Sequence, residues 1–202
     1  TQPNDVKKNT GLYTPSEILQ LTKDGSWGGS LELIEEVNIT SSTAQIDFTS
    51  IKENKYNVHF LQYENFKPTT DGKDARIRFF ESGVLESASV YQYAHQVNQT
   101  SQTLEQRSTG IAYIRAGVGT GNNTGERSNG YVYFYNLGNS AKYSFVTYHA
   151  SNLNTTSVYG VTFGGATLPQ ASTVDGIRFY ADGDGITTVT AKLYGVKQIW
   201  VT

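Results

Sequence analysis

The sequence predicts an all-β fold, an antiparallel β-sandwich of jelly-roll type preceded by a short N-terminal arm and helix. Three observations predict it. Many short segments rich in aromatic and β-branched residues alternate between apolar and polar positions. Turn residues, above all glycine with asparagine or aspartate, separate these segments. Beyond the first 30 residues no helical periodicity of useful length occurs, so a βαβ architecture is excluded.

The N-terminal segment carries the one helix signal. Residues 1–10 are polar without periodicity and are expected to form an arm. Thr14 is placed to cap the helix, Pro15 occupies its first position, and Glu17 completes a capping box. Gly25 stands where such a helix stops. The sequence therefore predicts a helix over residues 15–24.

Apolar residues of this helix need a surface to bury against. Ile18, Leu19 and Leu21 supply the apolar side chains, and a helix of about ten residues is not stable alone in water. Trp27 follows in a glycine-rich, hinge-like stretch. We therefore expect residues 1–30 to anchor the chain on another protein, and residues 31–202 to form the β-sandwich. The alternative is that the helix packs on its own domain.

From Leu31 onward the pattern is β to the end of the chain. The expected strands are Leu31–Val37, Ala44–Phe48, Tyr56–Tyr63, Ala75–Phe80, Val90–Val97, Ile111–Arg115, Tyr131–Tyr135, Tyr143–Tyr148, Val158–Phe163, Ile177–Tyr180, Thr187–Leu193 and Gln198–Val201. Three polar segments between them, 98–109, 117–129 and 150–157, are predicted to be long loops. Long loops in compact domains are usually functional, and Arg107, Asn122, Asn123 and Arg127 are the candidate receptor contacts in them.

Composition excludes several classes of protein. The 202 residues carry 16 Lys and Arg against 18 Asp and Glu, so there is no basic footprint for nucleic acid. No apolar run approaches the roughly 18 residues of a membrane-spanning helix, and we expect no membrane insertion. The chain has no cysteine, which excludes disulfides and thiolate metal sites.

Catalytic chemistry has no anchor in the sequence. His59, His95 and His149 lie in strand patterns without the spacing of a metal site, and no Gly-x-Ser-x-Gly motif occurs. The paired carboxylates are adjacent on a strand or fall in glycine-containing turns. We therefore expect no enzyme activity, no metal and no cofactor.

Tyrosines form the sharpest surface pattern. Alternation places Tyr131, Tyr133 and Tyr135 on one face of a strand, and Tyr91 and Tyr93 make a similar stripe with His95. Tyrosine offers an apolar ring with a polar tip, which suits protein interfaces and sugar stacking. Three interpretations remain: a half-buried outer strand, a subunit interface and a glycan platform. We expect a homo-oligomer, with a trimer favoured.

Several segments together resemble a known family. The helix segment from Thr14 to Leu21 is followed by Gly28–Ile34 and Ile46–Ile51. The later part contains Gly130–Asn136, Val174–Tyr180 and Lys192–Val196. These segments resemble bacteriophage virion proteins of marine and cyanobacterial phages, of the tail-fibre, head-fibre or decoration kind. The resemblance implies an appendage role and transfers no catalytic residues.

The leading hypothesis is therefore a bacteriophage virion structural protein. It would be assembled in the host cytoplasm, attached to other virion proteins through residues 1–30, and exposed as a tail fibre, receptor-binding tip or capsid decoration. Contact with host surface glycans is expected. The alternatives are a stand-alone carbohydrate-binding module and, ranked lower, a glycan-degrading enzyme.

Overall fold

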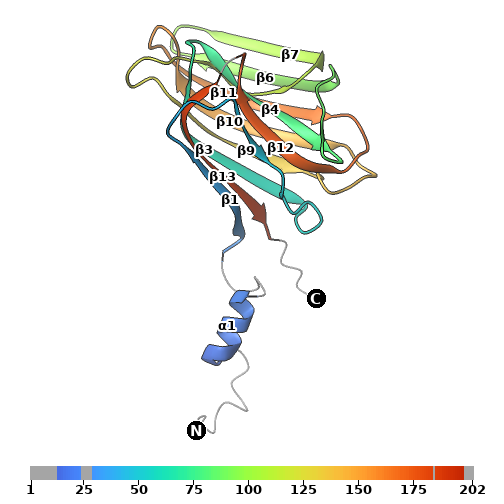
Figure 1. The fold of residues 1–202 in the computed structure, drawn as a ribbon. Helices are drawn as coiled ribbons and strands as arrows, with labels where there is room; N and C mark the ends of the chain where they lie inside the picture. The colour runs from blue at the N-terminus through green and yellow to red at the C-terminus, as the bar shows by residue number, and fades with distance from the viewer. Residues whose placement is uncertain (1–12, 24–28, 184, 198–202) are drawn as a thin grey trace.

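The protein is a two-layered antiparallel β-sandwich with one short helix outside it (Figure 1). The computed structural model describes residues 13–23, 29–183 and 185–197. In these residues one helix, α1 (Pro15–Lys23), precedes thirteen strands arranged in two packed sheets. The structure confirms the predicted antiparallel β-sandwich, whereas the jelly-roll connectivity stays a prediction.

The two sheets differ in size. The larger has eight strands in the order β1 (Leu31–Ile39), β13 (Ile186–Val196), β3 (Val58–Pro68), β9 (Ser128–Tyr135), β10 (Ser144–Leu153), β11 (Tyr159–Leu168), β6 (Tyr91–Gln99) and β7 (Thr103–Ile111). The smaller has β2 (Gln45–Phe48), β12 (Val174–Ala181), β4 (Lys73–Glu81) and β5 (Val84–Leu85), with β8 (Ile114–Thr120) also paired to β4. The smaller sheet packs against one face of the larger, and no third sheet in the described residues covers the opposite face.

Alternation along the strands builds the core between the sheets. In β10, Ser144, Val146, Tyr148 and Ala150 are buried, and the residues between them point outward. Successive side chains of a strand point to opposite faces, so every second residue reaches the core. The largest completely buried side chains are mostly aromatic: Tyr63, Tyr91, Phe48, Phe66, Phe79, Phe134 and Phe179.

All three predicted long loops contain strand residues, and one predicted strand is interrupted. The expected loop 150–157 begins inside β10, which continues to Leu153. Residues 98–109 are not a loop, because β6 continues to Gln99 and β7 begins at Thr103. The strand expected over 111–115 is interrupted by a bend at residues 112–113, which separates β7, ending at Ile111, from β8, beginning at Ile114, and β8 continues into the predicted loop 117–129. β7 is a polar strand at the edge of the sheet, and its sequence lacks the apolar alternation by which strands are recognised. The strand predicted at 198–201 lies outside the described residues.

The capping box of α1 forms as the sequence predicts. The backbone N–H of Thr14 donates to the Glu17 carboxylate at 2.6 Å, and the backbone N–H of Glu17 donates to the Thr14 hydroxyl at 3.3 Å. Figure 1 shows α1 standing off the sandwich, beyond the ends of β1 and β13. Leu19 is 54% exposed. The Leu21 side chain and Trp27 lie outside the described part of the chain.

The sandwich therefore has two different ends. Leu31 pairs with Val196 at the end near α1, which we call the proximal end. Pro68 pairs with Ile186 at the opposite, distal end. The loops 69–72, 121–127 and 154–157 meet at the distal end, where they are joined by hydrogen bonds and contacts.

A buried polar chain ties the β6–β7 edge of the larger sheet to the smaller one. Asp74 on β4 forms an ion pair with Arg115 of β8 at 2.9 Å. Arg115 donates to the Gln106 side-chain oxygen of β7 at 2.7 Å, and His95 of β6 donates to the same oxygen at 2.9 Å. The other ring nitrogen of His95 accepts from the Tyr148 hydroxyl at 3.0 Å. This series of polar contacts fixes β6 and β7 to β8 and β4 by an ion pair and hydrogen bonds.

Stability should fall in mild acid because of two buried histidines. Burial lowers the pKa of both His59 and His95 below 6.5, so below this pH the unfolded chain takes up protons that the folded chain does not. The stability that neutral histidines contribute is complete above pH 6.5 and is lost as the pH falls below it, by at most about 1.4 kcal/mol per pH unit and histidine. Urea unfolding measured between about pH 7.5 and 5 checks this. His95→Gln should reduce the slope, and a midpoint that stays constant over this range would contradict the account.

Candidate functional site

The outer face of the larger sheet carries the strongest candidate for an interaction surface. Strand register places outward side chains in rows that cross all eight strands. The central row consists of Leu33, Tyr194, Phe60, Tyr133, Thr147, Gly165, Ala94 and Arg107. Large apolar residues occupy its first half, and its second half consists of the small residues Thr147, Gly165 and Ala94 followed by Arg107 at the edge. The face is thus raised on one side and hollowed on the other.

The raised side is an aromatic ridge, which we define as Phe60, Tyr131, Tyr133, Tyr135 and Tyr194. The Phe60 ring lies 4.8 Å from that of Tyr133, 6.0 Å from Tyr194 and 6.1 Å from Tyr131. Tyr131 also stacks on His149 at 5.7 Å. Because these rings support one another across strands β13, β3, β9 and β10, the ridge is a preformed apolar surface.

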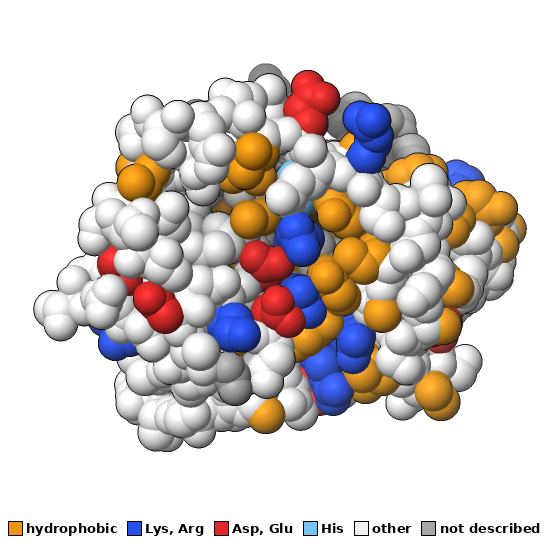
Figure 2. Space-filling model, turned by 90° about the horizontal axis from the view of Figure 1, so that it is seen from above, with side chains coloured by type: hydrophobic (Ala, Val, Ile, Leu, Met, Phe, Trp, Pro, Cys, Tyr) orange, Lys and Arg blue, Asp and Glu red, His pale blue; other side chains and the backbone are white. Residues whose placement is uncertain are grey.

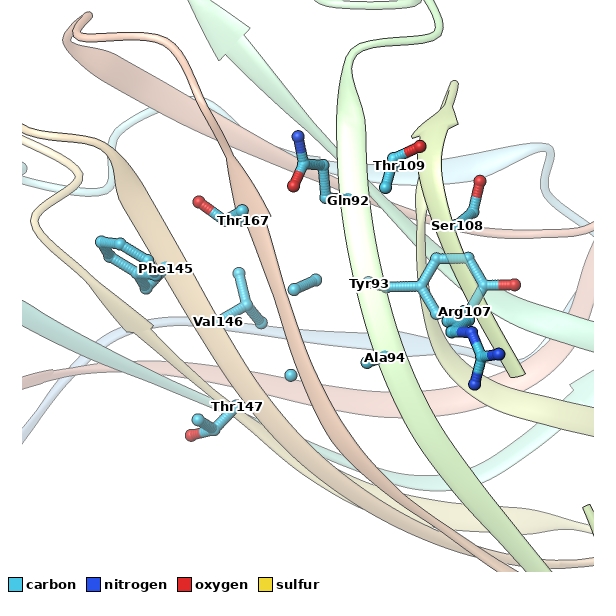
Figure 3. Close-up of a pocket in the computed structure, with 12 residues that line it drawn as sticks. Gln92, Tyr93, Ala94, Arg107, Ser108, Thr109, Phe145, Val146, Thr147 and Thr167 are labelled. Atoms are coloured by element: carbon cyan, nitrogen blue, oxygen red, sulfur yellow. The ribbon is translucent and has the colours of Figure 1, made fainter. Parts of the chain in front are cut away.

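The hollowed side is a trough over β10, β11, β6 and β7, with a volume of about 850 Å³. Its floor is low because Gly165 and Ala94, which are paired across β11 and β6, carry almost no side chain. Phe145 and Arg107 stand on opposite sides of it (Figure 3). The lining is mainly apolar, and Phe145 is 47% exposed.

Charged residues lie at the two edges of this face. Glu36 on β1 and Lys192 on β13 lie at the edge beside the ridge. Glu105 on β7 lies at the edge beside the trough, one row away from Arg107 on the same strand. Lys192 and Glu36 form an ion pair at 3.6 Å. Among the described residues, Arg107 and Glu105 make no side-chain hydrogen bond or ion pair. The trough edge therefore presents a cation and an anion that have no partner within residues 13–23, 29–183 and 185–197.

The tyrosine stripe of β9 lies as the sequence predicts. Tyr131, Tyr133 and Tyr135 share the outer face, and Tyr131 is 42% exposed, while Val132 and Phe134 between them are in the core. The shared outward face is confirmed. What covers the stripe remains a proposal.

The stripe of β6 faces the other way, which corrects the interpretation of Tyr91 as a surface contact. Tyr91 is completely buried, and its hydroxyl accepts from the Phe79 N–H at 2.9 Å and donates to the Glu86 carbonyl at 3.2 Å. Tyr93 is partly buried against the core and also lines the trough, so its role as a contact stays a prediction. Alternation establishes that the two tyrosines share a face with His95, but it does not tell which face is inside.

The loop candidates are divided between two places. Asn122, Asn123 and Arg127 lie in the distal loops, where Asn122 donates to the Thr69 carbonyl at 2.9 Å and Arg127 donates to the Asn123 carbonyl at 3.2 Å. Asn123 is exposed. Arg107 lies on strand β7 instead of in a loop, and it forms a wall of the trough.

The distal loops are held from within by a buried carboxylate. Glu126 is 2% exposed and accepts from the Asn123 N–H at 2.9 Å and from the Ser157 hydroxyl at 3.0 Å. These hydrogen bonds lower the pKa of Glu126, the bond from the Asn123 backbone most of all. Several side chains of the distal loops thus hold the loops in place by hydrogen bonds to one another. The exposed surface of the distal end is polar.

Opposite charges are mixed on the rest of the surface. Seen from above, basic and acidic side chains lie together in one band (Figure 2). In the smaller sheet Arg178 pairs with Asp47 at 2.7 Å, and Arg76 contacts Asp182. Within the described part of the chain, no three histidine, aspartate or glutamate side chains are placed to hold one metal ion, and no helix is long and apolar enough to cross a membrane.

Comparison with protein-family models, with curated proteins and with solved structures finds no match to this chain.

Sequence reasoning missed the main parts of the surface. Phe60 and Tyr194 complete the ridge, and Gly165 with Ala94 forms the trough floor, although none of them stands out in the sequence. Phe60 is followed directly by Leu61, which is equally apolar, so the sequence does not indicate which of the two faces outward. The signal that finds them is the strand order, which brings β13 and β3 beside β9.

Two tyrosine-to-phenylalanine changes should separate a core tyrosine from a ridge tyrosine. Tyr91→Phe leaves the buried Phe79 N–H without an acceptor, so it should lower the free energy of unfolding by about 1–3 kcal/mol. Tyr131→Phe removes a hydroxyl at an exposed position and should change it by less than about 0.5 kcal/mol. Urea denaturation of both variants checks this, and equal effects would contradict the assigned burial.

Proposed function

We propose that the chain is a structural protein of a bacteriophage virion, the β-sandwich head of an exposed appendage. The observation that carries the proposal is the contrast between the two ends of the molecule. A capped helix with an exposed leucine stands off the proximal end, and a set of fixed polar loops closes the distal end. The family resemblance of the sequence supports the same role.

The proximal end provides the attachment. Residues 14–23 form a complete capped helix, yet its apolar Leu19 is left in solvent and Figure 1 shows no sheet against it. Isolated helices of this length are marginal in water, so burial against another virion protein stabilises it. The sandwich supplies its own core and does not depend on the helix.

The distal end is directed away from the particle and contacts host surface glycans. Its loops are rich in asparagine, threonine and serine, whose side chains exchange hydrogen bonds with sugar hydroxyls as readily as with water. Asn123 is the exposed candidate contact, and Arg107 on the edge strand provides a guanidinium that no described side chain pairs with. A stand-alone carbohydrate-binding module would share this chemistry but would have no use for the proximal helix.

The chain acts as a homo-oligomer, for which we favour a trimer. The aromatic ridge of the larger sheet is too apolar to remain in water along a whole sheet face, and symmetric association of copies covers it.

Electron microscopy of particles from the phage that encodes the chain tests the virion role directly. An antibody against the sandwich should label purified particles, at the tail for a fibre or tip and over the head for a decoration protein. Purified particles without label would overturn the proposal. Cleavage of host polysaccharide by the purified chain would show an enzyme instead.

The attachment predicts a specific effect of one helix residue. Leu19→Asp places a charge where an apolar contact is needed, and it should strongly reduce the amount of the chain on particles while leaving the melting temperature unchanged. Gln20→Asp, at the neighbouring exposed position, serves as the control with the same charge change and should be incorporated normally. Deleting residues 1–25 should act like Leu19→Asp. A large drop in melting temperature after the deletion would show that the helix belongs to the core.

A further inference from the structure

We infer that the outer face of the larger sheet is self-complementary: the aromatic ridge of one copy packs into the trough of the next. This inference deepens the proposed homo-oligomer and rests on it. The occupant of the trough is a second copy of this chain, and three features of the face indicate this.

The first feature is complementary shape within one set of rows. Phe60 and Tyr133 form the highest part of the ridge in the same row in which Gly165 and Ala94 form the lowest part of the trough. A rotation about an axis parallel to the strands leaves positions along the strands unchanged, so each row of one copy lies at the same height as the same row of the other copy. Such a rotation therefore places the ridge of one copy opposite the trough of another.

The second feature is complementary charge at the edges. The same rotation sets edge strand β7 of one copy against β1 and β13 of its neighbour. Glu105 then lies level with the neighbour's ion pair of Glu36 and Lys192, which share one row, and Arg107 lies one row away from that pair. Two cations and two anions thus meet at the contact, and Arg107 and Glu105, which have no partner within the described residues, can join the neighbour's ion pair in one network.

The third feature is the position of the helix. In each copy α1 stands off the proximal end of the sandwich (Figure 1). An axis parallel to the strands brings the proximal ends of all copies together, so the α1 helices would emerge at the same end of the oligomer. Their exposed apolar side chains can then meet at one attachment point, as the proposed anchor requires. Contact of ridge with trough around a closed ring also suits a trimer, because each copy offers one ridge and one trough.

Engineered disulfides test the contact, because the chain has no cysteine of its own. Phe60 and Ala94 lie on strands four places apart in the sheet, roughly 19 Å at the usual spacing of strands. That distance is too long for a bond within one chain. The full-length double variant Phe60→Cys with Ala94→Cys should give covalently linked chains under mild oxidation. Phe60→Cys paired with Asn98→Cys, which lies on the same strand as Ala94 but two rows away, should give far less.

Light scattering of the unmodified chain, and of a variant with a filled trough, separates the possible failures. Ala94→Trp should dissociate the oligomer because the trough can no longer accept the ridge, whereas Thr103→Trp, an exposed outward position on β7 beyond the trough, should not. An unmodified chain that is monomeric would overturn both the oligomer and this contact. The virion role would then still be decided by the antibody labelling of particles. An oligomer that forms no Phe60–Ala94 cross-link and tolerates Ala94→Trp would overturn this contact alone.

Discussion

The two-layered arrangement of the sheets is the constraint on which the rest of the structure depends. The eight-stranded sheet packs against the five-stranded sheet through one face only, so its inner face is covered and no sheet of the described residues covers its outer face. Alternation sends half of all side chains to that outer face, and in this chain many of them are aromatic. A sheet with one solvated face ordinarily carries polar residues there. The aromatic ridge departs from that rule, and our account explains the departure by a second copy of the chain that covers the ridge.

The same constraint explains the polar chain beneath β6 and β7. Tyr91 of β6 still packs on Phe79, with the two rings 6.0 Å apart, and beside it the inner face is closed by an ion pair and hydrogen bonds. Asp74, Arg115 and Gln106 hold the edge at a fixed position. Such a network is directional, whereas apolar packing is not. Because the trough is formed by these same strands, its shape depends on this network.

Much of the fold was predictable, because the features that predict it depend on residues close together in the sequence. The capping box of Thr14 and Glu17 and the alternation around Tyr133 depend only on neighbouring residues. The surface was less predictable, because Phe60 and Gly165 become one row only through strand order. Tyr91 shows the limit most clearly: its pattern matched that of Tyr131, but it lies on the inner face. The strand β7 was missed because its inward Gln106 serves a polar network, so apolar alternation never develops.

Hydroxyl-radical footprinting of the chain in solution tests most directly whether a second copy covers the ridge. Tyr131 on the ridge and Tyr159 near the distal end are almost equally exposed in a single chain, at 42% and 49%. Our account predicts that Tyr131 is oxidised much more slowly than Tyr159 at micromolar concentration, and that the difference disappears on dilution to monomer. Equal oxidation rates at every concentration would show that the ridge is open to solvent and would contradict the account.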